Sequence, residues 1–356
     1  MSGRTLLVIG GTGFFGKSVL DAFARGLLKD WGVERVIALA RDTGRLVREC
    51  PELVGAGVEL VDADIATASA LPRADYVIHA ACSADAARYR DDPEGERRNI
   101  LGGVERFCEL ALTLGTARIV YCSSGAVYGA QPADVAALDE GFVPTPAKGL
   151  VDYKQAYAEA KRQAEAQIAA LGCDPRDLKR LPGEGRGSVS GCIATGPRPS
   201  PGRRDPGLTE MNVAVARPFA FVGAYLPRDR HFAIGNFLAD GLAGRAVKVA
   251  TRQAVWRSWM HADDLVRWLL TIADVASPAC PVYNVGSDEA LLVEDAARIV
   301  ADRFGGRALV PERTSTAVDR YVPSIAKARA ELGLTLTHDL ASAVDDVAAR
   351  LAEPCR

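Results

Sequence analysis

A tyrosine and a lysine four residues apart are the side chains in this sequence best suited to acid–base chemistry. Tyr157 and Lys161 fall in the alanine-rich stretch Tyr153–Leu171, which predicts a helix that presents both side chains on one face. Free tyrosine has a pKa of about 10, too high for a base at neutral pH, and a nearby ammonium favours the phenolate. Tyr157 is therefore the candidate base, with Lys161 lowering its pKa. Tyr153 forms no such pair, because residue 157 is a tyrosine rather than a lysine.

Two serines stand where a strand is expected to end. Ser123 and Ser124 follow the apolar segment Ala117–Cys122. A hydroxyl at that strand tip can hydrogen-bond the same substrate oxygen that Tyr157 deprotonates. The spacing Tyr-x-x-x-Lys alone arises often by chance. Its order after a serine pair, and after the glycine-rich turn described next, makes it a specific signal.

A glycine-rich turn near the start of the chain indicates a ligand with phosphates. The apolar segment Thr5–Ile9 runs into Gly-Gly-Thr-Gly-Phe-Phe-Gly, and a helical pattern extends from Lys17 to about Leu28. Glycines let backbone N–H groups approach a pyrophosphate, and a helix N-terminus favours its negative charge. A tight turn without a ligand is the alternative, but the position directly after a strand favours a dinucleotide site. The residues expected to line this site are Gly10, Gly11, Thr12, Gly13, Phe14, Phe15 and Gly16.

The ends of the next two predicted strands bear on which dinucleotide binds. An acidic residue at the end of the second strand suits NAD, whereas an arginine suits the 2′-phosphate of NADP. Ala40 stands where the acid is expected and Arg41 follows, so the sequence favours NADP over NAD; an ordinary exposed arginine is the alternative. Asp64 and Ile65 follow the third strand, where a carboxylate can hold the adenine amino group. A plain loop aspartate explains Asp64 equally well.

Short apolar segments alternate with helical patterns along the first half of the chain. This alternation predicts a parallel sheet with helices on both faces, a doubly wound α/β fold. Brevity and β-branched content favour strands over buried helix segments. The predicted strands are Thr5–Ile9, Arg35–Ala40, Val58–Val61, Tyr76–Ala80 and Ala117–Cys122, and Arg97–Leu114 is a predicted helix between two of them.

Composition excludes several classes of function. The 356 residues are 48% hydrophobic and carry a net charge of −2, so a large core is possible and no basic field favours nucleic acid. Eight cysteines without a Cys-x-x-Cys pair and four scattered histidines predict neither a metal site nor a disulfide framework. No apolar run approaches the roughly 20 residues that span a bilayer. We expect a cytoplasmic protein without a membrane partner.

Taken together, these motifs resemble the NAD-dependent epimerase/dehydratase family, the extended short-chain dehydrogenases/reductases that act on nucleotide sugars. The resemblance covers nearly the whole chain and is specific to the family, although not to one reaction. The residues that carry it are Gly10–Gly16, Asp64-Ile65, His79-Ala-Ala81, Asn99, Ser123–Gly129, Tyr157 with Lys161, Ala216–Phe219, Asn236-Phe237, Arg257–Asp264 and Tyr283–Gly286.

The resemblance implies a Rossmann domain over residues 1–218 and a smaller, mainly substrate-binding domain over 219–356, part of which returns to the first. It implies catalytic roles for Ser124, Tyr157 and Lys161 and contact with a nucleotide-sugar substrate by Ser123, Ser124, Asn236 and Arg257. It further implies a homodimer that pairs through the helices around Arg97–Leu114 and Tyr153–Leu171. It places Ala80, Ala81, Asn99, Pro218 and Phe219 around the cofactor. Together with Arg41, Asp64, Ile65, Tyr157 and Lys161, these are the residues expected at the cofactor besides the glycine-rich turn.

Two departures from the family pattern bear on the reaction. Sugar dehydratases of the family commonly carry acidic residues directly after the catalytic Ser or Thr, where this chain has Gly125 and Ala126. A carboxylate from elsewhere, such as Glu140, is the alternative acid. The usual Arg-x-Phe-Asn reads Arg217-Pro-Phe-Ala220, without the amide. We therefore expect 4-epimerisation through a keto intermediate; a 4,6-dehydratase, a 4-keto reductase and an NADP-binding sensor or scaffold are the alternatives.

Several single residues have a structural interpretation beside the functional one. Arg257 suits a diphosphate, but it also suits a surface salt bridge. Asn236 precedes a helical pattern and could be a helix cap. We interpret His79 as a packing residue on a strand end and His261 as structural, because no second histidine or acidic residue accompanies it at a suitable spacing.

An apparent insertion interrupts the family pattern at about residues 172–210. Its Arg-, Pro- and Gly-rich composition is typical of disorder. Loops of this length are uncommon inside compact domains. The segment suits inert surface, a contact with a partner or a cover over the substrate mouth, and the sequence alone does not decide between them.

Overall fold

Seven short apolar segments pair side by side into one parallel sheet, in the order β11-β6-β5-β4-β1-β2-β3. The computed structural model describes residues 3–82, 86–115, 117–143, 152–173, 210–230 and 232–352. Five of the seven strands confirm those predicted from the sequence, and their ends agree within two residues. The strands are β1 (Arg4–Ile9), β2 (Val33–Ala40), β3 (Val58–Asp62), β4 (Tyr76–His79), β5 (Arg118–Cys122), β6 (Asn212–Pro218) and β11 (Val282–Val285).

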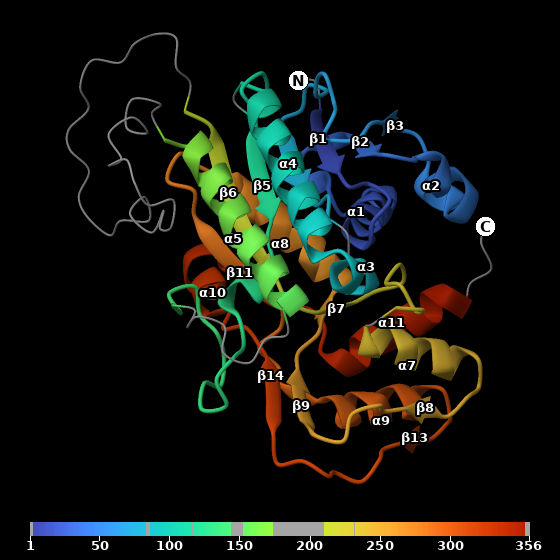
Figure 1. The fold of residues 1–356 in the computed structure, drawn as a ribbon. Helices are drawn as coiled ribbons and strands as arrows, with labels where there is room; N and C mark the ends of the chain where they lie inside the picture. Colours follow the sequence, from blue (N-terminus) through green and yellow to red (C-terminus); the bar gives the residue numbers. More distant parts are fainter. Residues whose placement is uncertain are drawn as a thin grey trace.

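Helices cover both faces of this sheet (Figure 1). Along β1, Leu6 and Val8 point into one hydrophobic core, and Leu7 and Ile9 point into the other. α1 (Phe14–Ala24), α8 (Ala262–Asp274) and α10 (Ala326–Leu332) contribute to the first core. α4 (Pro93–Ala111) and α5 (Asp152–Leu171) contribute to the second. This is a doubly wound Rossmann-like fold, as the sequence predicts. Shorter helical segments are α2 (Gly44–Glu49), α3 (Ala86–Asp91), η1 (Lys29–Trp31), η2 (Pro51–Leu53) and η3 (Gly125–Tyr128).

Helix boundaries differ from the predictions where local capping sets them. The first helix begins three residues earlier than predicted, directly at the glycine-rich turn, because Gly13 is its N-cap. It ends at Ala24 because Gly26 adopts a left-handed conformation with φ +76°. α4 also begins early, since the side chain of Asp92 accepts a hydrogen bond from the Gly95 N–H.

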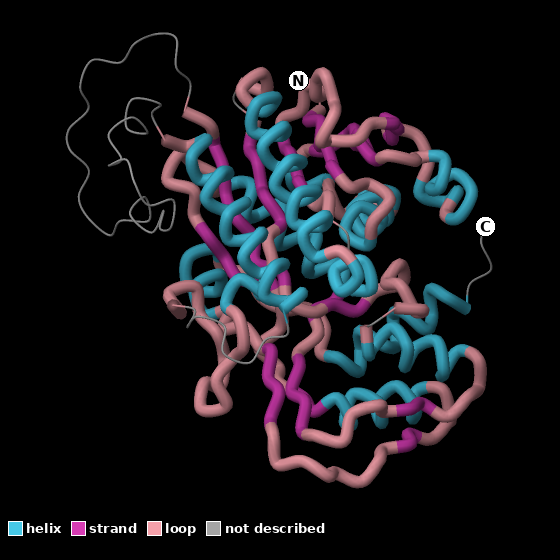
Figure 2. The backbone as a smooth tube through the Cα atoms, viewed as in Figure 1, coloured by secondary structure: helices cyan, strands magenta, loops and turns pink. Residues whose placement is uncertain are grey.

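A smaller lobe lies below the sheet in Figure 1 and has its own apolar core. Three of its helices contribute to that core: α7 (Ala233–Leu242), α9 (Val293–Arg303) and α11 (Leu340–Ala352). The short strands make small separate sheets, drawn in magenta in Figure 2. They are β7 (Phe221–Val222), β8 (Val247–Lys248), β9 (Ala254–Arg257), β10 (Met260–His261), β12 (Leu291–Leu292), β13 (Ala308–Leu309) and β14 (Val318–Tyr321). Between them the chain returns to the large sheet through α8 and β11.

Most of the apparent insertion at residues 172–210 lies outside the described residues, which resume at Glu210. Among the described helices, none combines the length and the apolar character needed to cross a membrane.

Candidate active site

The glycine-rich turn lies where the sheet order reverses, between β1 and β4. Gly10 has φ +98°, a conformation that favours glycine. A Cβ on Gly10 would lie 2.9 Å from the carbonyl carbon of Ala80 and 2.9 Å from the amide nitrogen of Ala81. The turn therefore packs against the backbone that follows β4, at the topological switch point where ligands of such sheets bind.

The other glycines of the turn allow its backbone to pack closely against neighbouring atoms. A Cβ on Gly11 would lie 2.7 Å from the Cβ of Ala38, and one on Gly16 would collide with the backbone of Gly11. Gly13 is exposed and leads directly into α1. A turn with glycine at three of its four positions, at the N-terminus of a helix, fits the pyrophosphate of a dinucleotide. Gly10, Gly11, Thr12, Gly13, Phe14, Phe15 and Gly16 would hold it.

The residues expected around the rest of the cofactor are spread over the same edge of the sheet. Arg41 is exposed directly after β2. The Asp64 carboxylate accepts a hydrogen bond from the Ala66 N–H (3.0 Å), and Ile65 is buried in the core. Asn99 donates to Glu96 (3.4 Å) on α4. Asp64 and Ile65 thus also have structural roles.

Lys161 is fully buried next to the end of β5. Its Nζ donates to the Tyr121 hydroxyl (3.2 Å) and to the Cys122 carbonyl (3.1 Å). Burial disfavours the ammonium, but the nearby Cys82, Tyr121 and Tyr157 favour it and the pKa of Lys161 is raised. Lys161 is therefore a fixed positive charge behind the reacting groups.

Tyr157 faces this charge from the helix turn before, with its ring edge-on to that of Tyr89 (centroids 4.9 Å apart). Burial raises the pKa of Tyr157 above its usual value and so does nearby Cys82; Lys161 and a hydrogen bond with Ser124 act in the opposite direction. Lys161 lowers the pKa of Tyr157 as expected, but in the protein alone this effect is smaller than the rise that burial of the phenol causes. Tyr157 is therefore a neutral phenol until further positive charge arrives.

The two serines after β5 lie in different surroundings. Ser123 is buried, and its hydroxyl has no partner. Ser124 is partly exposed and caps η3, where its Oγ accepts from the Ala126 N–H (3.1 Å). Only Ser124 contacts Tyr157. The structure thus brings Ser124, Tyr157 and Lys161 together.

A third hydroxyl at this point is missed by the sequence motifs. Burial raises the pKa of Tyr321, at the end of β14, and nearby Ser124 acts in the opposite direction. A Cβ on Gly125 would lie only 2.6 Å from the Tyr321 hydroxyl and 2.7 Å from the Phe219 ring. No local signal marks Tyr321, because the lobe's strand pairing sets its position. We call Ser124, Tyr157, Lys161 and Tyr321 the reactive cluster.

The proposed substrate residues of the smaller lobe divide into two cases. Arg257 lies next to Tyr321, but its Nη2 donates to the Asp319 carboxylate at 2.7 Å. Arg257 therefore forms the salt bridge that was the structural alternative, and this does not exclude binding of a diphosphate by Arg257. Asn236 is exposed inside α7, whose N-cap is Phe232, so the helix-cap alternative is wrong.

Glu140, the alternative acid, is bound to the backbone of β11. Its carboxylate accepts from the Asn284 N–H (2.8 Å). Burial raises the pKa of Glu140, while this bond and the charges of Lys327 and Arg217 oppose the rise.

The histidines occupy separate structural positions. His79 packs against Phe107 and Tyr121, and burial lowers its pKa to about 3, so it is neutral. The sequence places no histidine or acidic partner at a suitable spacing from His261, but the fold brings both to it. Its ring lies 4.2 Å from that of His338, and its Nε2 contacts Asp346 at 2.9 Å, because the fold brings α11 against β10.

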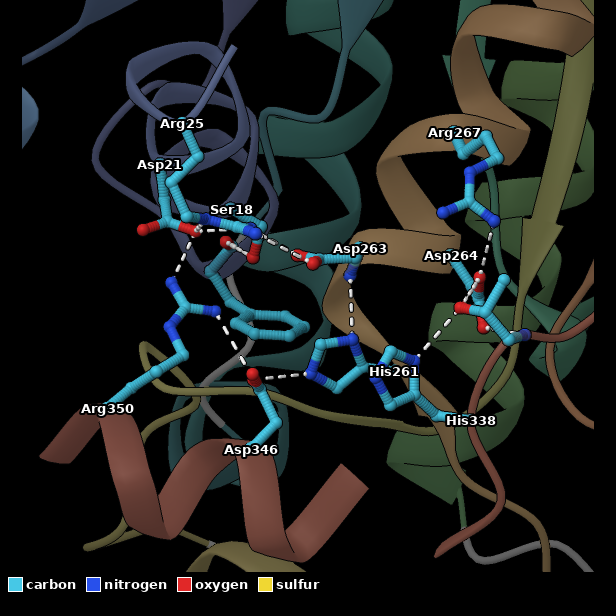
Figure 3. Close-up of polar contacts among 12 residues, drawn as sticks. Ser18, Asp21, Arg25, His261, Asp263, Asp264, Arg267, His338, Asp346 and Arg350 are labelled. Carbon is cyan, nitrogen blue, oxygen red and sulfur yellow. Dashed lines mark hydrogen bonds and ion pairs between the residues drawn. The ribbon is translucent and has the colours of Figure 1, made fainter. Parts of the chain in front are cut away.

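His261 belongs to a charged network between the two lobes (Figure 3). Arg25 on α1 donates to Asp263 at the start of α8 (2.9 Å). Arg350 on α11 pairs with both Asp346 and Asp21. We call this network the inter-lobe cluster: Asp21, Arg25, His261, Asp263, Asp346 and Arg350.

Comparisons with known proteins agree with this architecture. A model of the NAD-dependent epimerase/dehydratase family matches residues 6–175 and 207–286, leaving out most of the apparent insertion. A UDP-glucuronic acid decarboxylase of Arabidopsis thaliana is 23% identical over 335 residues, which are 92% of this chain and 83% of that protein.

Solved structures share the fold at low identity. A UDP-glucose 4-epimerase of Thermotoga maritima with UDP-glucose superposes with a TM-score of 0.69 at 19% identity, over 98% of this chain and 99% of that one. The dTDP-glucose 4,6-dehydratase DesIV of Streptomyces venezuelae, with NAD bound, gives 0.70 at 20%, over 99% and 100%. The match of the family model over most of the sequence shows that the chain belongs to the NAD-dependent epimerase/dehydratase family.

Proposed function

We propose that this protein is a nucleotide-sugar 4-epimerase that works through a 4-keto intermediate. The observation that carries the proposal is the packing around Gly125. The position that holds an acid in dehydratases has no room for even a methyl group, because the Tyr321 hydroxyl and the Phe219 ring fill it. The reactive cluster supplies hydroxyls and one ammonium but no carboxylate.

These groups suffice for reversible oxidation of a hydroxyl. Tyr157 takes the proton of the C4 hydroxyl, and Ser124 donates a hydrogen bond to the same oxygen. Through its fixed charge, Lys161 stabilises the phenolate form of Tyr157 that accepts this proton. A nicotinamide bound on the glycine-rich turn supplies the hydride acceptor and donor, and its positive ring adds to the charge of Lys161. Return of the proton from Tyr157 after the sugar has turned completes the epimerisation.

Elimination of water requires more than this set. Loss of the C6 hydroxyl needs an acid at the departing oxygen and a base at C5, each within hydrogen-bond reach. Gly125 and Ala126 carry no titratable group. Glu140 is bound to the backbone of β11. We therefore favour epimerisation over 4,6-dehydration as the reaction of this protein.

Decarboxylation is a second candidate, favoured by the relatives named UDP-glucuronic acid decarboxylase. Oxidation at C4 of a sugar with a C6 carboxylate gives a β-keto acid. That acid loses carbon dioxide and gains a proton at C5, and return of the hydride to C4 leaves the reaction redox-neutral. This route also needs no carboxylate base at residue 125.

One experiment separates these reactions. The purified protein is incubated with NAD or NADP and, separately, with UDP-glucose, UDP-galactose and UDP-glucuronic acid, and products are followed by mass spectrometry and chromatography. Interconversion at constant mass supports the epimerase. A product lighter by carbon dioxide supports the decarboxylase, and a product lighter by water overturns the argument from Gly125. Reduction of an added 4-keto sugar alone indicates a reductase, and binding without turnover a sensor.

The choice of dinucleotide is tested separately. The NADP preference rests on exposed Arg41 alone. Structures with this fold are named as NAD complexes, which gives that preference no support. Calorimetric titration with both cofactors decides it: tighter binding of NADP that Arg41→Asp abolishes supports the role of Arg41, and at least equal affinity for NAD rejects it.

We also propose a cytoplasmic homodimer that pairs through α4 and α5, which lie side by side in Figure 1. Their outer surface carries a hollow of about 320 Å³ lined by Glu94, Arg97, Gln155, Ala156 and Glu159. The six described cysteines are all free thiols, which suits a reducing compartment. Analytical ultracentrifugation of the protein and of Arg97→Glu tests the dimer: a shift of the variant to monomer supports it, and a monomeric wild type rejects it.

A further inference from the structure

The helix α5 carries three polar side chains on successive turns of one face. Tyr157, Lys161 and Glu165 follow one another at intervals of four residues, a spacing that puts them in a row along the helix. The first two belong to the reactive cluster. The third lies beside Arg217 of β6, the strand against which α5 packs (Figure 1).

Glu165 and Arg217 form a bidentate ion pair that is largely shielded from water. Arg217 Nε donates to Oε1 of Glu165 at 3.0 Å, and Nη2 donates to Oε2 at 2.7 Å. Each side chain is only 12% exposed. Because both ions lose their hydration, such a pair is weak evidence for stability. The two parallel bonds do, however, fix one side chain in orientation relative to the other.

A third N–H group of Arg217 reaches the turn that follows Ser124. Arg217 Nη1 donates to the Tyr128 hydroxyl at 2.9 Å, and the guanidinium carbon lies 4.9 Å from the centroid of the Tyr128 ring. The Tyr128 hydroxyl donates in turn to Oδ1 of Asn284 at 2.8 Å. Tyr128 is the last residue of η3, whose N-cap is Ser124. We call Glu165, Arg217 and Tyr128 the α5 brace.

α5 thereby holds the segment around Ser124 on both of its sides. Before Ser124, Lys161 Nζ donates to the Cys122 carbonyl at 3.1 Å. After Ser124, Arg162 Nη1 donates to the Val127 carbonyl at 2.8 Å, and the α5 brace holds the end of η3. The serine is thus fixed relative to the helix that carries the candidate base.

We propose that Arg217 is a positioning residue that joins Glu165 of α5 to Tyr128 of η3. Through this link it keeps the hydroxyl of Ser124 in place relative to Tyr157. In this role Arg217 acts through other side chains rather than on the substrate. The role suits arginine, because three N–H groups of one rigid plane point to two different elements, whereas the ammonium of a lysine donates from a single atom.

Steady-state kinetics of conservative variants test the turnover part, which rests on the proposed function. Tyr128→Phe keeps the ring and loses the hydroxyl to which Arg217 donates, and Arg217→Lys keeps the charge and loses the planar fork. For each variant we expect kcat to fall about tenfold with KM nearly unchanged, the loss typical of one hydrogen bond. The double variant should be no slower than the slower single one, because both changes break the same link. Additive losses in the double variant overturn the proposal.

Tyr76→Phe is the matched control. The Tyr76 hydroxyl also accepts from an arginine, Arg4 (2.7 Å), and donates to a side chain of another element, Asp274 (2.7 Å). Tyr76 is buried at the start of β4, at the opposite end of that strand from the reactive cluster. Both tyrosine variants should lower the melting temperature, but only Tyr128→Phe should lower kcat. Unchanged kcat in Tyr128→Phe, or an equal fall in Tyr76→Phe, overturns the proposal.

A second measurement needs no substrate, so that it separates this proposal from the proposed function. The protein is labelled at the ζ carbons of its tyrosines, and the Tyr157 signal is assigned by its absence from Tyr157→Phe. Arg217→Lys and Tyr128→Phe should each shift the Tyr157 signal, and Tyr76→Phe should leave it unmoved. A Tyr157 signal that stays in place in either brace variant, or that moves equally in Tyr76→Phe, overturns the proposal. Failure to turn over any nucleotide sugar rejects the proposed function and leaves this result standing.

Discussion

The reactive cluster and the inter-lobe cluster are both polar groups held between packed elements, but they differ in charge. The inter-lobe cluster pairs three aspartates with two arginines and His261. The reactive cluster has a single charged group, Lys161, among neutral hydroxyls. Aspartates paired with arginines stay ionised at neutral pH, whereas a neutral phenol beside one ammonium has a proton to exchange. The difference agrees with the proposal that the inter-lobe cluster supports the fold and the reactive cluster performs chemistry.

The pKa shifts run in opposite directions in the two clusters. Burial raises the pKa of Tyr157 in the reactive cluster. In the inter-lobe cluster burial also acts to raise the pKa of Asp346, but the hydrogen bond and charge of His261 outweigh it and the pKa is lowered. The Tyr157 phenol therefore resists ionisation, whereas the Asp346 carboxylate is ionised in the protein by itself.

The largest expected effect is the loss of turnover in Tyr157→Phe. Removing a general base typically costs about two to four orders of magnitude in rate. Cofactor affinity and melting temperature should change little, because only the phenolic oxygen is lost. Steady-state kinetics, calorimetry and thermal melting check this, with Tyr153→Phe as the matched control. Wild-type turnover in Tyr157→Phe would show that Tyr157 is not the base, and the contrast between the reactive cluster and the inter-lobe cluster would no longer hold.

Asp346→Ala should have the reverse profile, with lower stability and nearly normal kcat. The change leaves His261 and Arg350 without a common partner, a loss of about 1–3 kcal/mol in the free energy of unfolding. Asp345→Ala is the control, because its carboxylate is exposed and pairs only with Arg303 at the surface, which predicts a change within about 0.5 kcal/mol. Urea unfolding measures both. A variant at Asp346 with normal stability and poor turnover would assign the inter-lobe cluster to catalysis.

Gly125→Ala tests how tightly the reactive cluster is packed. The new methyl group meets the Tyr321 hydroxyl and the Phe219 ring, and we expect about a tenfold fall in kcat, equal to ~1.4 kcal/mol. Gly55→Ala is the control, because its Cβ would meet no atom within 4 Å. Steady-state kinetics of the two variants decide the matter, and equal activity would show that Tyr321 moves aside freely.

The smallest expected effect is a loss of folding stability at low pH. The pKa values of Asp263 and Asp346 lie below the ordinary 3.8. A carboxylate with a lowered folded-state pKa stabilises the fold fully above its unfolded value and loses that contribution as the pH falls through the folded one. Stability should thus be insensitive to these groups from neutral pH to about pH 5 and decline below about pH 4. Unfolding free energies of wild type and Asp346→Asn should converge there; a constant gap down to about pH 3 contradicts this.

What the sequence predicts correctly depends on local signals. Short apolar runs predict the strands of the large sheet. The closely spaced glycines predict the glycine-rich turn, and the structure explains them, because at Gly10, Gly11 and Gly16 the neighbouring atoms leave no space for a Cβ. Tyr321 and Asp346 escape prediction because the residues that they contact, Phe219 and His261, are distant in sequence. Their positions depend on the β9–β14 register and on how α11 packs, which no local pattern encodes. The substrate roles of Asn236 and Arg257 stay predictions.

The ion pairs of α1 also have a consequence for the order in which the protein is made. Arg25 and Asp21 leave the ribosome early, yet their partners Asp263 and Arg350 are synthesised much later. Domains generally fold as units during synthesis, N-terminal part first. Here Asp21 and Arg25 pair with each other at the end of the first helix, and each has a further partner on α8 or on the last described helix. The large lobe of the nascent chain therefore reaches its final electrostatic state only when the small lobe has been made.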